Sequence, residues 1–133
     1  MIGDTIASAL IEKALDGTWQ RQKVIANNIA NQETPGYKAS SVSFEHMLKN
    51  QVKNLQTAKT SKANFQEGIA SIKKSKISID TNRSISERAD GNSVNMELEN
   101  IQMAKAQIQY QFLTRALTDY YSRLRYAISE GKR

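Results

Sequence analysis

A heptad repeat of apolar residues near the carboxyl end constrains this chain more than any other feature. Between residues 103 and 127, apolar side chains recur at alternating steps of three and four residues. On a helix this spacing places them in one line, as long helices that stay in contact along their length require. The sequence therefore predicts a helix over residues 92–130, with Asn92 or Ser93 as its N-cap. The expected seam consists of Met103, Ala106, Tyr110, Leu113, Leu117, Tyr120, Leu124 and Ala127.

A second apolar row shares the first half of this predicted helix. Lys105 interrupts the row. Two apolar rows are more than one partner helix can cover, so we expect further neighbours along this helix. The row consists of Val94, Leu98, Ile101, Ile108 and Phe112.

The amino-terminal 32 residues also have a helical pattern. Two apolar stripes form a broad face on a helix of about 28 residues, roughly 42 Å long at 1.5 Å per residue. Trp19 lies near this face. It is expected either to anchor another chain or to pack on the partner helix of the same chain. The expected packing residues are Ile6, Leu10, Ile11, Leu15, Ile25 and Ile29.

Together these patterns predict an all-α fold. The long terminal helices (residues 1–32 and 92–130) are expected to form an antiparallel, coiled-coil-like pair within one structural unit. Residues 33–55 hold a turn and a short amphipathic segment, and residues 56–91 form a basic linker. We expect this linker to be irregular and partly disordered, although residues 77–79 alternate like a short strand.

A single copy of such a chain is expected to be marginally stable. Its mean hydropathy is −0.58 and only 39% of its residues are hydrophobic. Ordering costs about 1.5 kcal/mol per residue, whereas burial contributes only about 25 cal/mol per Å² of apolar surface. The chain is therefore predicted to be a subunit that becomes ordered on assembly.

The composition argues against an enzyme and predicts no catalytic residue, metal site or cofactor. His46 is the only histidine, no phosphate-binding or nucleophile motif occurs, and the chain has no cysteine for a disulfide or thiolate zinc site. The net charge is +6, but the lysines of the middle segment are scattered, which argues against nucleic-acid binding. No apolar stretch approaches the ~20 residues of a membrane span, and no cleaved secretory signal is expected. A membrane-surface helix is a weaker alternative for the amphipathic carboxyl end.

Residues 26–38, ANNIANQETPGYK, end the first helix abruptly. Pro35 has no amide hydrogen, and Gly36 can adopt the positive φ that the third position of a type II turn requires. Asn27, Asn28 and Asn31 fall within five residues, with Asn27 and Asn31 one turn apart, and the amides of all three suit a polar seam recognised by another chain. The alternative is a helix that is frayed by asparagine and ended by a turn.

These residues resemble the amino-terminal signature of bacterial flagellar rod and hook proteins. DGNSVNME, over residues 90–97, and Gln109–Gln111 are similar to the carboxyl end of proximal-rod members. The resemblance covers about 45 residues at the start and 40 at the end. The matching signature residues are Asn27, Asn28, Asn31, Thr34, Pro35, Gly36 and Tyr37.

The resemblance implies a structural subunit of the proximal rod in the flagellar basal body, within the periplasm, that transmits motor torque. Its partners would be further copies in a helical assembly, other rod proteins and the export-gate/basal-body junction protein. It also implies export by the flagellar type III apparatus without signal cleavage. Two alternatives stay open, a generic coiled-coil adaptor and another axial rod protein of the same family.

Export substrates of this kind carry a phenylalanine followed four residues later by an apolar residue. Phe44 and Leu48 fit this export-gate element, and we expect them to be exposed just after the turn. The alternative is that both side chains pack locally on a helix.

Overall fold

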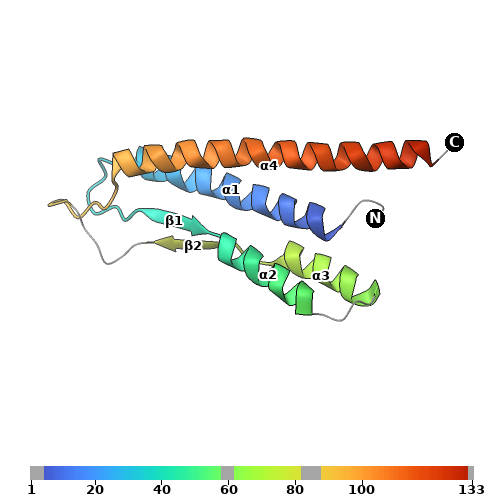
Figure 1. The fold of residues 1–133 in the computed structure, drawn as a ribbon. Helices are drawn as coiled ribbons and strands as arrows, with labels where there is room; N and C mark the ends of the chain where they lie inside the picture. The colour runs from blue at the N-terminus through green and yellow to red at the C-terminus, as the bar shows by residue number, and fades with distance from the viewer. Residues whose placement is uncertain (1–4, 58–61, 82–87, 132–133) are drawn as a thin grey trace.

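A computed structural model describes residues 5–57, 62–81 and 88–131 (Figure 1). The described chain is mostly helical, with a long helix at each end, as the sequence predicts. In chain order the elements are α1 (Ile6–Ala30), β1 (Ser40–Ser43), α2 (Glu45–Thr57), α3 (Lys62–Lys74), β2 (Ser78–Thr81) and α4 (Met96–Glu130).

Helix α1 lies between α4 and a layer formed by the two strands, α2 and α3 (Figure 1). At one end of α1, the Thr5 hydroxyl is 2.7 Å from the Tyr120 hydroxyl. Near the other end, Asn28 Nδ2 donates to Glu99 Oε1 at 3.1 Å. The two long helices therefore run in opposite directions. Since α4 has 35 residues and α1 has 25, α4 extends well beyond Thr5.

The strands correct the prediction of an all-α fold. β1 and β2 pair antiparallel, with Ser40 opposite Thr81 and Val42 opposite Ile79. Only the strand-like alternation at residues 77–79 signalled this sheet. The serine-rich β1 gave no signal, because a strand of four residues is stabilised by its partner and by the helix that it packs on.

The prediction of an irregular middle segment is wrong for residues 62–74, which form α3, and for residues 78–81, which form β2. Residues 58–61 and 82–87 of that segment lie outside the described residues. Ile69 and Ile72 of α3 are buried against Ala9 of α1, with Leu55 of α2 beside them. The few apolar side chains of α3 are too scattered to form a core by themselves, and the segment is ordered because they pack on the apolar face of α1.

A second apolar cluster lies where β1 meets α1. It is built on Ala14, Val42 and Phe44, and Leu113 of α4 packs against it. Both clusters are small and lie mainly between α1 and the layer of strands, α2 and α3, so the core of one copy is thin.

The predicted N-cap of α4 is also wrong. Asn95 caps this helix, and its side chain accepts a hydrogen bond from Leu98 N at 3.2 Å. Asn92 does not fill this role because its side chain is used to close the end of α1.

Candidate functional site

The two segments that carry the sequence signature meet at one end of the helix pair, where Asn92 closes α1. The fully buried amide of Asn92 donates to the carbonyl oxygens of Asn31, Gln32 and Thr34 at 2.9, 3.0 and 2.8 Å. Asn31 is the C-cap of α1 and the other two residues follow it, so these bonds fix the path of the chain where it leaves the helix. The Asn92 side-chain oxygen accepts from Val94 N at 2.8 Å. One asparagine from the other signature segment thus anchors the turn that follows the first helix.

The turn that follows α1 has the predicted type II geometry. Gly36 has a φ of 71°, and Tyr37 N donates to the carbonyl of Thr34 at 3.2 Å across Pro35 and Gly36. The Gly36 amide in turn donates to the carbonyl of Asp90 at 2.9 Å. The positive φ at the third position needs a residue without a side chain, which is the physical reason for glycine there.

Further hydrogen bonds join the two segments side by side. Ser93 N donates to the carbonyl of Tyr37 at 3.1 Å, and Ala39 N donates to Ser93 Oγ at 2.8 Å. Lys38 Nζ donates to the carbonyl of Gly91 at 2.8 Å. We name the contact between residues 31–39 and 90–94 the signature tie, because both halves of the sequence signature lie in it.

Asn28 links α1 to both β1 and α4 through side-chain hydrogen bonds. It is buried, and its Nδ2 donates to the carbonyl of Ser40 at 2.8 Å and to Glu99 Oε1 at 3.1 Å. Its Oδ1 accepts from Ser40 N at 3.0 Å and from the Tyr37 hydroxyl at 3.2 Å. Because these bonds use the whole amide within the chain, the predicted seam recognised by another chain is wrong for Asn28.

Asn31 is likewise used within the chain. Its amide donates to the carbonyl of Asn27 at 2.8 Å and to Asn27 Oδ1 at 3.3 Å. Its Oδ1 accepts from the Thr34 hydroxyl at 3.2 Å. The predicted stacking of Asn27 and Asn31 one turn apart therefore holds, but its role here is to shape the end of α1.

Partial burial raises the pKa of two ionisable groups at this site. Burial raises the pKa of Glu99, and the hydrogen bond from Asn28 offsets only part of this effect. Burial also raises the pKa of Tyr37, and the negative charge of Glu99 adds to the increase. Tyr37 therefore stays neutral and acts as a hydrogen-bond donor at physiological pH.

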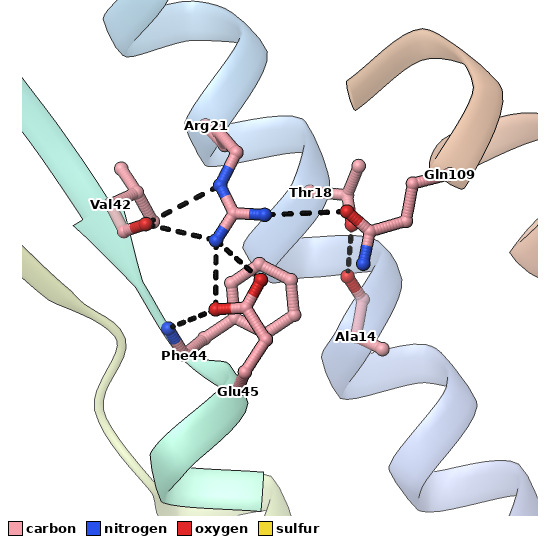
Figure 2. A network of polar contacts seen from close by, with 7 residues as sticks. All are labelled: Ala14, Thr18, Arg21, Val42, Phe44, Glu45 and Gln109. Atoms are coloured by element: carbon pink, nitrogen blue, oxygen red, sulfur yellow. Dashed lines mark hydrogen bonds and ion pairs between the residues drawn. The ribbon is translucent and has the colours of Figure 1, made fainter. Parts of the chain in front are cut away.

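Arg21 forms a second junction, in which it joins α1 to the other layers (Figure 2). Its guanidinium pairs with Glu45 at 2.6 Å and donates to the carbonyl of Val42 at 3.0 Å. Another nitrogen donates to Gln109 Oε1 of α4 at 3.3 Å. Burial opposes ionisation of Glu45, but hydrogen bonds from Arg21 and the backbone together lower the pKa of Glu45.

Phe44 packs beneath this junction, which overturns the expectation that it is exposed (Figure 2). The guanidinium carbon of Arg21 lies 4.6 Å from the centroid of the Phe44 ring. A Cβ atom on Gly17 would lie only 2.5 Å from that ring. Glycine at position 17 therefore makes room for Phe44 against α1. Leu48 is half-buried in the same cluster.

The expected packing residues are placed unevenly. Ile25 is buried, and Tyr110 is 38% exposed. The half-buried members are Ile6, Leu10, Ile11, Leu15, Ile29, Met103, Leu113, Leu117, Tyr120 and Leu124.

In the second apolar row, Val94 lies just before α4 and is buried, whereas the members on α4 are exposed. Phe112 is 71% exposed and Ile108 is 68% exposed. Trp19 on α1 is 54% exposed, so the expectation that it packs on the partner helix of the same chain is wrong. Along both long helices, one copy leaves large apolar side chains in solvent.

The structure also bears on metal binding and on membrane spans. In the part of the chain that the structure describes, no group of three acidic, histidine or cysteine residues is placed to hold a metal ion. Over the same residues, no helix is both long enough and apolar enough to cross a membrane.

Comparison with known proteins agrees with the geometry. A family model described as "Flagella basal body rod protein" matches residues 7–38, which span α1 and the turn. The chain is 34% identical over 122 residues to the flagellar basal body rod protein FlgB of Bacillus subtilis, covering 92% of each chain. The chain belongs to this family of flagellar basal body rod proteins. It is also similar to FlgB of Buchnera aphidicola (37% over 105 residues, 75% of this chain and 77% of the relative) and of Escherichia coli (33% over 112 residues, 80% and 81%).

Family membership settles the class of protein. Rod proteins are structural, so this chain is a structural subunit of the flagellar basal body rod and not an enzyme, as the sequence predicts. It assembles with other rod components of the flagellar basal body.

Sequence reasoning missed several residues that build this site. Gly17 interrupts an otherwise apolar helical face, and a glycine at such a place signals close approach of another element. Arg21 gave no comparable signal, because its partner Gln109 lies far away in the sequence. Asn92 belongs to the DGNSVNME signature, but its bonds to the end of α1 could not be predicted from it for the same reason.

Proposed function

We propose that this chain is a subunit of the proximal part of the rod, where it transmits torque through helical packing. The observation that carries the proposal is the apolar surface left uncovered on both long helices, with Phe112 and Ile108 as its most exposed members. A soluble monomer rarely exposes such a row, whereas a subunit of an assembly covers it with neighbours.

In this proposal, α1 and α4 act as an antiparallel, coiled-coil-like strut. Helix α4 is about 52 Å long at 1.5 Å per residue. The signature tie at one end and Arg21 near the middle hold α1 against sliding along α4. The function of the chain is then mechanical stiffness and not catalysis. Lateral contacts between subunits transmit the torque.

We further propose that the chain passes through the type III export apparatus without loss of a signal peptide. Phe44 and Leu48 remain candidates for the export-gate element. Since Phe44 is only 1% exposed in the folded chain, a gate would recognise it only in an unfolded chain. Small apolar clusters favour this, because little buried surface must be given up on unfolding.

The proposed partners are further copies of this chain, other rod proteins and the export-gate/basal-body junction protein, in the periplasmic part of the rod. A generic coiled-coil adaptor is the rival function. It accounts for the helix pair but not for the signature tie, which closes one end of the pair through residues that match the rod signature.

The test is incorporation into basal bodies. In the bacterium from which this chain comes, deletion of its gene should abolish motility, and the wild-type gene should restore it. Leu117→Asp should fail to restore motility, because Leu117 is half-buried in the seam and a charge there has no partner. Gln107→Asp adds the same charge at an exposed position of α4 and should restore motility. Normal motility without the gene would reject the proposal.

A further inference from the structure

A groove of about 670 Å³ lies between α1 and β2, on a face of α1 that α4 does not cover. Trp19 and Ile79 line it, and each is 54% exposed. Ala26 and Ala30 line its far end and leave room there because their side chains are small. We call this the α1 groove.

A ridge of matching character runs along the outer face of α4. It consists of Leu98, Ile101, Ile108 and Phe112, which are 51, 53, 68 and 71% exposed. These four residues lie on one side of α4, and Lys105 interrupts the apolar row between Ile101 and Ile108. We call this the α4 ridge.

The groove and the ridge cannot meet within one copy. Contacts between α1 and α4 run through other residues, such as Gln22, which donates to the carbonyl of Ala106 at 3.2 Å. Because Trp19 and Phe112 lie on faces turned away from that contact, the same chain offers two unlike apolar surfaces. Unlike surfaces on one subunit form a heterologous contact, which repeats without closing unless rotation closes a ring.

We propose that the α4 ridge of one copy docks into the α1 groove of a second copy of this chain. The inference rests on the proposed rod function and names the surface through which copies contact one another. The partner in this contact is a second copy because both surfaces, the groove and the ridge, occur on this chain.

Charge and spacing support an antiparallel docking with Phe112 against Trp19. Arg115 lies three residues beyond Phe112 and Asp16 three residues before Trp19, so this register brings these opposite charges together. Both are exposed, and neither forms an ion pair with another described residue. The same register sets Ile101 opposite Ala30, eleven residues along each helix.

Trp19 is the only tryptophan, so its fluorescence reports directly on the groove. For the purified wild-type chain, we expect the emission to shift to shorter wavelength as the protein concentration rises. Phe112→Ala should raise the concentration at the midpoint of this shift about tenfold or more, as for a central interface residue. Phe65→Ala is the matched control, because Phe65 is 44% exposed on α3, and it should leave the midpoint unchanged.

A charge exchange tests the register. Asp16→Arg and Arg115→Asp should each weaken association, and the double variant should restore it, with the same circular dichroism for all four proteins. Emission of the wild type that does not depend on concentration would overturn the proposal, as would a double variant no better than the single ones.

Motility separates this inference from the rod function. If the Phe112→Ala and Arg115→Asp strains swim like the wild type, the docking is wrong while the rod function stands. If Arg115→Asp abolishes motility but the wild-type chain never self-associates, the ridge contacts a different protein and the inference is overturned. Only normal motility in the absence of the gene would reject the rod function itself.

Discussion

Replacement of Asn92 by alanine tests whether the signature tie holds the two ends of the chain together. The change removes two N–H donors, which are shared among the carbonyls of Asn31, Gln32 and Thr34, and the oxygen that accepts from Val94 N. At a net contribution of about 1 kcal/mol for each of the two donors and the one acceptor, the upper estimate of the loss is about 3 kcal/mol. Thr34 is exposed and its carbonyl can find water, so we expect a loss of about 2 kcal/mol in the free energy of unfolding.

Urea denaturation followed by circular dichroism at the helix band measures this loss. The midpoint should fall while the slope of the transition stays the same, because the surface exposed on unfolding does not change. Asn100→Ala is the matched control, since Asn100 lies exposed on α4, and its stability should change by no more than about 0.5 kcal/mol. A loss below about 1 kcal/mol for Asn92→Ala would refute the reasoning, because the tie would then contribute little.

Three further predictions concern other residues of the site. Gly17→Ala should lower the free energy of unfolding by about 1–3 kcal/mol in the same assay, although alanine favours helices, because its Cβ would lie 2.5 Å from the buried Phe44 ring. Phe44→Ala combined with Leu48→Ala should reduce secretion measured in culture supernatant; undiminished secretion would reject the export-gate role. Glu99→Gln should raise stability as the pH rises above 4.5 and change nothing below it, because the raised pKa of Glu99 destabilises the wild type only where the carboxylate ionises. Glu97→Gln, at an exposed position on the same helix, is its control in urea titrations at several pH values.

Both long helices and the turn could be predicted from the sequence because their causes are local. The heptad spacing of α4 and the Pro35–Gly36 pair act over a few residues, and the structure contains the helix and a φ of 71° at Gly36. Proline and glycine restrict the backbone wherever they occur, so such a turn needs no information from the rest of the fold.

The middle segment could not be predicted, because its order depends on distant partners. Ile69 and Ile72 are isolated apolar residues in a basic stretch, and they become core residues only against Ala9. Likewise, the sequence around Phe44 predicts an exposed side chain, whereas in the fold Phe44 packs between Gly17 and Arg21.

The sequence by itself determined the periodic helices, the turn and, through its signature, the class of protein. Tertiary structure alone decided that Asn92 binds the end of a helix some sixty residues away and that the Asn28 amide forms its hydrogen bonds within the chain. The reason is physical. Backbone preferences and helical spacing are properties of neighbouring residues, whereas burial and side-chain hydrogen bonding depend on which surfaces meet, and that is settled only when the chain has folded.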